Sequence, residues 1–231
     1  MYGICILPLC PMRSEPSDRA ELTNEILFGE RLIVEDRQEK WSLVRCVEYD
    51  YSGWVDNKQY AVVENNEYES IGQWGGIVDE PLASVSLATG KLLVPMGSRL
   101  PEVTSCNHTP SELARKLINT PYLWGGKSCM GIDCSGLTQV VYKVCGIQLP
   151  RDASQQALIG KVVESLDDAI ENDLCFFAND KGCVIHVGIY MGDNCIIHAS
   201  GQVRIDRLDS RGIYNADMGQ YTHTLCSIRR I

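Results

Sequence analysis

The stretch Gly131-Ile132-Asp133-Cys134-Ser135-Gly136 leads into a segment whose apolar residues recur at helical spacing. These residues share one face of a helix: Leu137, Val140, Val141 and Val144. Gly146 is a typical stop signal, so we expect a helix from Cys134 to Cys145. Cys134 then lies in the first turn, where the helix dipole and free backbone N–H groups lower the pKa of a thiol. On position alone, Cys134 is either a nucleophile or one more buried cysteine among eleven.

Segments on either side of this helix indicate an α+β arrangement. Upstream, Thr109-Pro110 is a favourable N-cap followed by proline at the first helical position, which predicts a helix over Ser111–Asn119. The loop Tyr122-Leu123-Trp124-Gly125-Gly126 has the glycine and aromatic content that suits a cleft wall. Downstream, short apolar runs predict three strands: Leu174–Phe177, Val184–Met191 and Cys195–His198. A helix that leads into antiparallel strands is typical of the α+β class.

Two of the four histidines lie on the last two of these strands. His186 alternates with three residues that are expected to share its face: Val184, Gly188 and Tyr190. If the hairpin is centred on Gly192, His186 lies directly opposite His198, with Cβ atoms about 5 Å apart. One imidazole can then act as a base and the other can orient it, which is the general arrangement around an activated nucleophile. The alternative is a pair of satisfied core histidines, and a register slip of one residue would separate them.

The first third of the chain is expected to form short strands separated by turns. The runs Arg31–Glu35, Trp41–Cys46 and Tyr51–Val55 have the length and spacing typical of a small barrel or sandwich. Residues 76 to 104 hold one further strand-like run, Lys91–Pro95. This later segment is either a linker or part of a second small barrel.

Composition excludes some classes of function. The 231 residues carry a formal charge of −9, whereas a nucleic-acid partner requires a clustered basic surface. No Cys-x-x-Cys pair is present, so no zinc site is indicated, and no motif implies another metal or an organic cofactor. Most cysteines lie in apolar runs, where we expect small buried hydrophobes in a reducing compartment: Cys5, Cys10, Cys46, Cys145, Cys175, Cys195 and Cys226.

The apolar N-terminus, Met1 to Cys10, does not have the pattern of a signal peptide. It lacks a positively charged leader and a small-residue cleavage site, and Gly3 and Pro8 interrupt it. No other run is long enough to span a bilayer. We therefore expect a cytosolic protein with no membrane partner, although a chain trimmed of its leader has the same appearance.

The order of motifs in the first third resembles a bacterial SH3-like domain. The matching motifs are Arg13-Ser14-Glu15-Pro16, Gly29-Glu30, Trp41 and Gly53-Trp54-Val55. The resemblance implies an SH3-like β-barrel at residues 1–75, followed by a linker or partial second SH3-like element at 76–106.

Five later segments, in order, are similar to the NlpC-type cell-wall cysteine peptidases: Pro121–Gly126, Asp133–Gly136, Leu149–Asp152, His186–Tyr190 and Ile197–Ser200. One such segment alone is a weak signal, whereas five in sequence are specific. The resemblance covers residues 107–231 and implies a papain-like α+β catalytic domain. With an SH3-like barrel in front, the chain resembles γ-D-glutamyl-L-diamino acid endopeptidases, which cut murein peptides between D-Glu and the diamino acid and require a free N-terminal L-Ala.

The resemblance implies a role for each matching position. Cys134 is the nucleophile, His186 its base and His198 the residue that orients the base. Tyr122 and the backbone amide of Cys134 are donors to the oxyanion, because acyl transfer needs donors aimed at the developing charge.

Four further residues are implied in substrate binding. Asp133 is expected to bind the free amine, although it is also a natural helix cap, and Ser135 is expected to line the pocket. The SH3-like domain is expected to contribute Tyr51 and Glu21, which are otherwise an ordinary barrel aromatic and a solvated charge. The chain departs from some relatives at Ala153, where they carry serine, and this puts in doubt a hydroxyl contact from that position.

Together these features predict a hydrolase that acts through a thioester on a short peptide such as L-Ala-γ-D-Glu-diaminopimelate, in cell-wall peptide recycling or turnover. One alternative is a non-catalytic module that binds murein peptides, which the presence of all three catalytic residues disfavours. Another is an amidase or acyltransferase on a different acyl substrate, which uses the same acyl-enzyme chemistry. The sequence leaves open whether the diamino acid is diaminopimelate or lysine.

Overall fold

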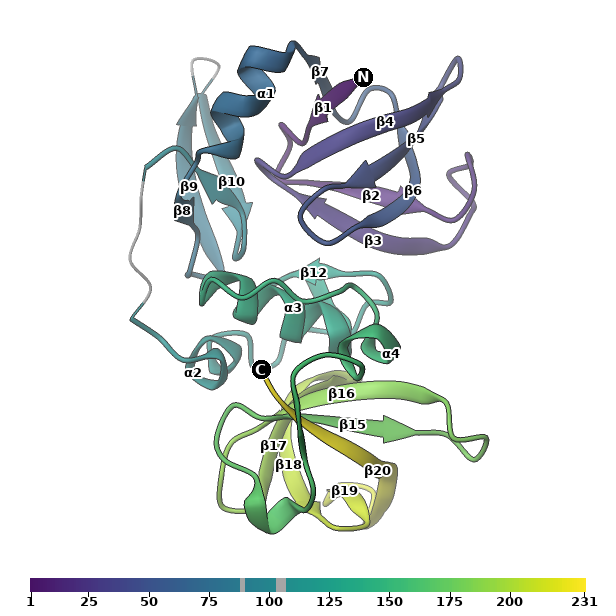
Figure 1. The fold of residues 1–231 in the computed structure, drawn as a ribbon, viewed down its shortest axis with the longest axis vertical. Helices are drawn as coiled ribbons and strands as arrows, with labels where there is room; N and C mark the ends of the chain where they lie inside the picture. The colour runs from purple at the N-terminus through teal and green to yellow at the C-terminus, as the bar shows by residue number, and fades with distance from the viewer. Residues whose placement is uncertain (88–89, 103–106) are drawn as a thin grey trace.

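The computed structural model describes residues 1–87, 90–102 and 107–231. The molecule is elongated, with a β-rich domain at each end and a layer of short helices between them (Figure 1). The N-terminal residues form one β-rich domain and the C-terminal residues form the other, and the end of the chain returns to the layer of helices between them.

Seven strands form the N-terminal sheet, in the order β3-β2-β6-β5-β4-β1-β7. The strands are β1 Tyr2–Ile4, β2 Leu9–Arg13, β3 Leu22–Leu27, β4 Arg31–Arg37, β5 Trp41–Cys46, β6 Tyr51–Asp56 and β7 Ala61–Val63. Alternation puts one face of each strand into the core, as in β5, where Ser42, Val44 and Cys46 are buried. The three strands expected between residues 31 and 55 are present, in the small barrel that the sequence predicts.

A middle segment packs against this barrel. It consists of α1 Asn65–Gly72 and two two-stranded sheets, β8 Gly76–Ile77 with β11 Arg99–Leu100 and β9 Leu82–Leu87 with β10 Gly90–Pro95. Val78 and Val94 form an apolar cluster with Phe28 of the barrel. In its described residues, the segment from 76 to 102 is therefore a pair of small sheets and not a second closed barrel.

The C-terminal domain is a second barrel with helices on its outside. Its strand order is β14-β20-β15-β16-β17-β18-β19, and β20 also pairs with β19, which closes six of the strands into a ring. The elements are β14 Lys161–Val163, η1 Leu166–Asp168, β15 Leu174–Ala178, β16 Val184–Tyr190, β17 Cys195–Ser200, β18 Gln202–Asp209, β19 Gly212–Asn215 and β20 Gln220–Arg230. The preceding elements are α2 Pro110–Arg115, β12 Lys127–Ser128, β13 Gly131–Ile132, α3 Cys134–Val144 and α4 Ala153–Gln156.

The apolar face of α3 packs against one face of the sheet. Leu137 and Val141 share a core cluster with Val187 and Ile197 of β16 and β17. Each fully buried aliphatic side chain of this kind contributes about 1.5–3 kcal/mol. The periodic face expected from the sequence is thus the surface that fixes α3, and with it Cys134, on the sheet.

Capping residues determine where the helices begin. Thr109 and Glu112 form a capping box at the start of α2, as the sequence predicts. The helix ends at Arg115 instead of the expected Asn119, because the next residues bond three positions back and Asn119 takes a positive φ of 69°. Helix α3 begins at Cys134 as expected.

Buried charges join the two domains. The carboxylate of Glu30, in the N-terminal barrel, accepts a 2.6 Å hydrogen bond from Lys143 of α3 and lies 3.6 Å from Lys127 of β12. All three side chains are almost fully buried. Burial alone would raise the pKa of Glu30, but the two ammonium groups lower it to about 2. Because unpairing a buried ion pair is strongly destabilising, this contact fixes the catalytic domain against the barrel.

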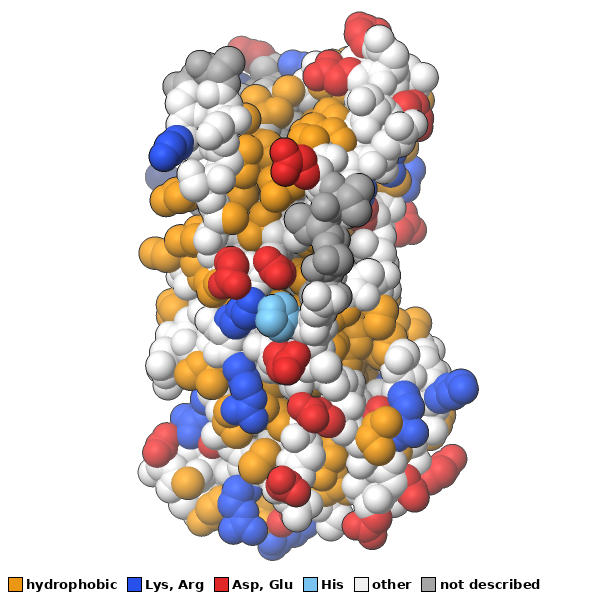
Figure 2. Space-filling view, turned by 90° about the vertical axis from the view of Figure 1, so that its left-hand side faces the viewer, with side chains coloured by type: hydrophobic (Ala, Val, Ile, Leu, Met, Phe, Trp, Pro, Cys, Tyr) orange, Lys and Arg blue, Asp and Glu red, His pale blue; other side chains and the backbone are white. Residues whose placement is uncertain are grey.

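The surface carries charges of both signs. Figure 2 shows acidic and basic side chains mixed over one face, with an area of hydrophobic side chains in its upper half. Among the helices of the described residues, none has the length and apolar character that crossing a bilayer would require.

Candidate active site

Cys134 lies at the start of α3, against β16. The backbone N–H groups of Ser135 and Val187 act to lower the pKa of its thiol, and Val187 directly follows His186 in the chain. Burial, followed by the nearby Asp133 carboxylate, raises the pKa of Cys134 to about 11 and outweighs these amides. The lowered pKa expected from the helix position alone is therefore wrong for the resting site. Among the described contacts, no hydrogen bond joins the thiol to the His186 ring, and such pairs often tighten only when substrate binds.

The two predicted histidines meet, but not in the expected register. Nε2 of His186 lies 2.8 Å from Nδ1 of His198. His198 pairs with Gly188 and not with His186, because the hairpin is centred on Asp193, in a three-residue loop of positive φ at Gly192–Asn194. A shift of two residues keeps both rings on one face. A Cβ on Gly188 would lie 2.9 Å from Cβ of His198, so glycine leaves room for the second ring.

A β-bulge interrupts β16 beside His186. Phe177 pairs with His186 and Ala178 with Val184, so Ile185 is an extra residue on that strand, and it is 54% exposed. Val184 packs against the helix-side core and does not share the face of His186 as strict alternation predicts.

A third histidine stacks on the first. The rings of His223 and His186 are 4.2 Å apart with 28° between their planes, and Phe177 lies 5.7 Å from His186. Burial, followed by the neighbouring His198 and His223, lowers the pKa of His186 well below its usual value. Burial also lowers the pKa of His223 to about 4. Both rings are therefore neutral at pH 7, and His186 is available as a base.

Asp133 is both a helix cap and an ion-pair partner. Its carboxylate accepts hydrogen bonds from Gly136 N–H (2.7 Å), Gly125 N–H (2.8 Å) and the Ser135 hydroxyl (3.3 Å). The guanidinium of Arg151 adds two more, at 3.0 and 2.6 Å. These donors leave the carboxylate little capacity for a substrate amine, so of the two roles expected for Asp133 the geometry supports capping.

The same cluster continues into the N-terminal barrel. Nε of Arg151, a side chain that is 2% exposed, donates a 2.9 Å hydrogen bond to Asn24. Gly125 has a φ of 80°, and a Cβ there would lie 2.6 Å from the carbonyl oxygen of Leu22. Only glycine fits both conditions, which explains the glycine-rich loop before the nucleophile.

A cavity of about 460 Å³ opens at Cys134, between the two domains. Six of the eight predicted site residues line it: Glu21, Tyr51, Tyr122, Asp133, Cys134 and Ser135. The other two, His186 and His198, are buried and do not line it. Burial, followed by the nearby Cys134, raises the pKa of Tyr122 to about 12, so its hydroxyl remains a hydrogen-bond donor at neutral pH.

The segment after Arg151 also reaches this cavity. Asp152, Ala153 and Ser154 all line it, and burial raises the pKa of Asp152. A hydroxyl-bearing residue, Ser154, therefore lines the cavity one position after Ala153.

Cysteine burial is more varied than the sequence predicts. Of the seven cysteines expected in the core, four are buried: Cys5, Cys10, Cys46 and Cys175. Cys145 and Cys195 are partly exposed and Cys226 is exposed, which corrects the expectation for these three. No cluster of three potential metal ligands occurs in the described chain.

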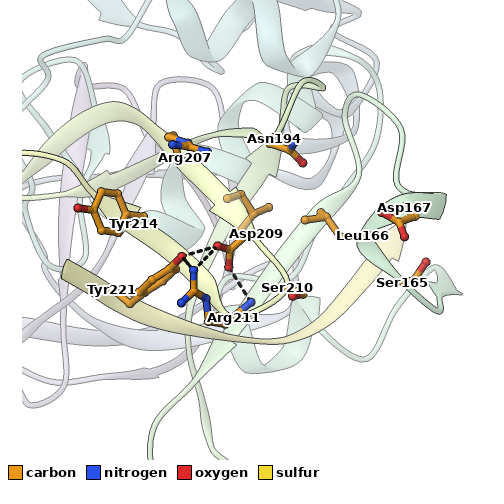
Figure 3. A pocket seen from close by; sticks show the side chains of 11 residues that line it. Ser165, Leu166, Asp167, Asn194, Arg207, Asp209, Ser210, Arg211, Tyr214 and Tyr221 are labelled. Carbon is orange, nitrogen blue, oxygen red and sulfur yellow. Dashed lines mark hydrogen bonds and ion pairs between the residues drawn. The ribbon is translucent and has the colours of Figure 1, made fainter. Parts of the chain in front are cut away.

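A larger cavity of about 770 Å³ lies elsewhere on the C-terminal barrel (Figure 3). Its lining includes Arg211, whose guanidinium lies 3.0 Å from Asp209 and stacks on the ring of Tyr221. These groups satisfy one another, and the cavity shares no lining residue with the one at Cys134. Size alone therefore does not make it the candidate active site.

Comparison with known proteins identifies the family. A family model described as the NlpC/P60 family matches residues 119–222, and one described as the bacterial dipeptidyl-peptidase Sh3 domain matches residues 12–59. A γ-D-glutamyl-L-lysine dipeptidyl-peptidase of Bacillus cereus is 30% identical over 227 aligned positions, covering 78% of this chain and 67% of that relative. The chain belongs to the NlpC/P60 family. It is accordingly a cysteine peptidase of a cell-wall hydrolase family.

Two further proteins match nearly the whole of this NlpC/P60 chain. Dipeptidyl-peptidase 6 of Lysinibacillus sphaericus is 28% identical, covering 94% of this chain and 96% of its own. The crystal structure of an NlpC/P60 family protein from Bacillus cereus superposes with a TM-score of 0.84 at 22% identity, covering 100% of this chain and 99% of that one. These matches confirm the expected fold, an SH3-like barrel followed by a papain-like α+β domain.

Several residues of the NlpC/P60 site were not singled out from the sequence. The sequence indicates Trp124 only as part of a glycine-rich loop, yet its indole N–H donates a 2.6 Å hydrogen bond to Glu21. Asp206 lies 3.0 Å from Nε2 of His198, and His223 stacks on His186. Asp206 had one available signal, because a tight turn after Ser200 returns β18 beside the strand that carries His198.

Proposed function

We propose that this NlpC/P60 peptidase hydrolyses the γ-D-Glu–diamino acid bond of murein peptides that carry a free N-terminal L-Ala. The observation that carries the proposal is the shared cavity, in which Cys134 of one domain faces the same space as Glu21 and Tyr51 of the other. A cavity walled by a second domain suits the end of a short peptide. The relatives from Bacillus cereus and Lysinibacillus sphaericus are both dipeptidyl-peptidases, and the name of the first specifies a γ-D-glutamyl-L-lysine bond, which supports the proposal.

The proposed chemistry follows from the positions of the side chains. The sulfur of Cys134 attacks the γ-carbonyl carbon of D-Glu, and its proton passes to His186, which His198 orients. The negative charge that develops on the carbonyl oxygen is met by the hydroxyl of Tyr122 and the backbone N–H of Cys134. The protonated His186 then gives its proton to the departing amine, leaving a thioester. Water, deprotonated by His186, hydrolyses the thioester and restores the thiol.

The free amine of L-Ala is proposed to bind at the barrel side of the cavity. Glu21 and Asp152 both line that space and can pair with an ammonium group, and the phenol of Tyr51 lies beside them. Asp133, with its hydrogen bonds already made, would hold the cavity in shape together with Ser135. A carboxylate-lined subsite supports the proposed preference for a substrate with an unblocked N-terminus.

The experiment is incubation of the protein with L-Ala-γ-D-Glu-diaminopimelate, its N-acetylated form and its L-lysine analogue, followed by mass spectrometry. We expect release of the diamino acid from the free peptides only, and loss of release in Cys134→Ala. Cys183→Ala is the matched control, because this cysteine is exposed and lies outside the cavity. Equal cleavage of the acetylated peptide would contradict the amine subsite. No cleavage of any peptide by protein whose Cys134 is reduced and can be alkylated would contradict the proposed function.

The recycling of short wall peptides in the cytosol stays a prediction. It rests on a cavity suited to short peptides, of the kind that wall turnover releases. Fractionation of cells that produce the protein, followed by immunodetection, tests it, and detection in the wall or medium fraction would contradict it.

A further inference from the structure

A buried carboxylate stands behind the histidine pair. Nε2 of His198 lies 3.0 Å from Oδ2 of Asp206, which projects from the next strand, β18. Asp206 and both histidines are buried, and His198 is only 1% exposed. The hydrogen-bonded order is therefore His186, His198, Asp206, with Asp206 at the end of the row away from His186.

Arg204 keeps this carboxylate ionised. Its guanidinium donates two hydrogen bonds to Asp206, at 2.7 and 2.9 Å, and a third to Asp217 at 2.8 Å. Burial alone would raise the pKa of Asp206, but the hydrogen bonds from His198 and Arg204 lower it below its usual value. At neutral pH Asp206 is thus a carboxylate, which accepts hydrogen bonds and donates none.

The Asp206 carboxylate determines which ring nitrogen carries the proton in His198 and, through it, in His186. Because Asp206 only accepts, Nε2 of His198 must carry the proton that it donates. A neutral His198 then has a bare Nδ1, which accepts from Nε2–H of His186 at 2.8 Å. Nε2 of His186 is therefore its protonated nitrogen, and Nδ1 is the nitrogen left with a lone pair.

We propose that Asp206, held by Arg204, is a positioning residue that fixes the tautomers of both histidines and so leaves Nδ1 of His186 free to accept a proton from Cys134. The inference deepens the proposed function and rests on it for the roles of Cys134 and His186. It assigns to Asp206 the task that a buried aspartate performs one step closer to the base in serine-protease triads.

The proton balance is simple. When the S–H bond of Cys134 breaks, its electron pair forms the carbon–sulfur bond and its proton binds Nδ1 of His186. His186 is then an imidazolium whose Nε2–H still donates to His198. The charge of Asp206, relayed by the polarised His198 ring, stabilises this cation, and no proton needs to reach Asp206 itself.

The test combines a spectroscopic and a kinetic measurement. The tautomers are read from ¹H–¹⁵N correlation spectra of ¹⁵N-labelled protein, in which only four histidines need to be assigned. In the wild-type protein we expect His186 and His198 both protonated at Nε2. In Asp206→Asn the introduced amide can donate to His198, so the proton of each ring moves to Nδ1 and the base is blocked. We expect kcat to fall about 10²–10³-fold, with KM changed less than about twofold, and Asp206→Glu to recover at least about tenfold.

Asp209→Asn, on the same strand but outside the site, is the matched control and should keep wild-type kcat. Protonation of His198 at Nδ1 in the wild-type protein would overturn the inference, and so would an Asp206→Asn variant within about threefold of wild-type kcat. If Asp206→Asn does not fold, the wild-type spectrum still shows whether both histidines are protonated at Nε2. Arg204→Gln is then the second variant, and we expect it to keep the wild-type tautomers while kcat falls several-fold.

The failure of this inference is distinguishable from failure of the proposed function. If the wild-type protein cleaves no murein peptide, the proposed function fails, yet the tautomers and the iodoacetamide alkylation rate of Cys134 remain measurable. An alkylation rate at pH 7 about tenfold lower in Asp206→Asn than in the wild-type protein supports the positioning role. Equal rates, with wild-type tautomers in the variant, overturn it.

Discussion

The indole N–H of Trp124, in the catalytic domain, donates a 2.6 Å hydrogen bond to the carboxylate of Glu21 in the SH3-like barrel. The two residues are 103 positions apart and both line the cavity at Cys134. Trp124 is 59% exposed, so this contact lies at the mouth of the cavity and not in the core. The junction of the domains therefore forms part of the wall that a substrate meets.

Substitution of Glu21 can test the effect of its negative charge separately from that of its hydrogen bond to Trp124. Glu21→Gln keeps an acceptor for Trp124 but removes the charge that would pair with the free amine. We expect KM for the free peptide to rise about tenfold, the equivalent of about 1.4 kcal/mol, with kcat changed less than about twofold. Trp124→Phe is the complementary variant, which removes the donor and keeps the charge, and should raise KM less. Unchanged KM in Glu21→Gln would remove this residue from the amine subsite.

The hydroxyl of Tyr122 is expected to act only on the transition state. Tyr122→Phe removes one donor to the oxyanion and should lower kcat about 10²-fold while KM stays near the wild-type value. The thermal midpoint should not move, because the phenyl ring keeps its packing. Tyr214→Phe, outside the site, serves as the control in the same steady-state assay. A loss confined to KM would assign Tyr122 to substrate binding instead.

The resting thiol is expected to be neutral at pH 7. Its pKa of about 11 means that the thiolate fraction grows as pH rises, while the lowered pKa of His186 prevents a protonated partner from forming near neutrality. The alkylation rate of Cys134 by iodoacetamide should therefore increase steadily from pH 7 to pH 10. Peptide mapping by mass spectrometry separates Cys134 from the exposed Cys183 and Cys226. A plateau that begins below pH 6 would instead indicate a preformed thiolate–imidazolium pair.

The buried charges at the domain junction predict a large effect on stability. Glu30→Ala leaves Lys143 and Lys127 buried without their carboxylate and should lower the free energy of unfolding by about 3–5 kcal/mol. Urea denaturation followed by circular dichroism measures the loss. Lys58→Ala is the control, because Lys58 pairs with Asp56 at 3.2 Å while remaining 85% exposed, and it should cost less than about 1 kcal/mol. Equal midpoints for the two variants would contradict the role given to the junction.

Local sequence signals predicted much of the fold. The capping box at Thr109, the periodic face of α3 and the alternation in β5 each depend on residues within a few positions of one another. The end of α2 was missed, because Asn119 adopts a left-handed conformation that its own sequence neighbourhood does not specify. Local rules thus predict where elements begin better than where they end.

Sequence motifs predicted which residues line the site. The contacts that depend on strand register or on residues far apart in the chain were not predicted. The register of the histidine hairpin depends on positive φ at Asp193 and Asn194, which moves the centre of the hairpin by one residue and the pairing by two positions. The hydrogen bond between Arg151 and Asn24 joins residues 127 positions apart, so no spacing rule indicates it. The donors that meet Asp133 also come from several separate segments, so no spacing rule indicates them, and its role toward a substrate amine stays a prediction.

The buried contact of Glu30 with Lys143 also limits how the gene of this peptidase can be cut or recombined. A catalytic fragment that begins near residue 107 would retain Lys127, Lys143 and Arg151 but lose the carboxylate and the amide that they meet in the barrel. An SH3-like domain from another protein would serve in its place only if it brought an acid and an amide to the same two positions. The barrel and the catalytic domain therefore form one folding unit, and we expect the two to be retained together and not exchanged separately.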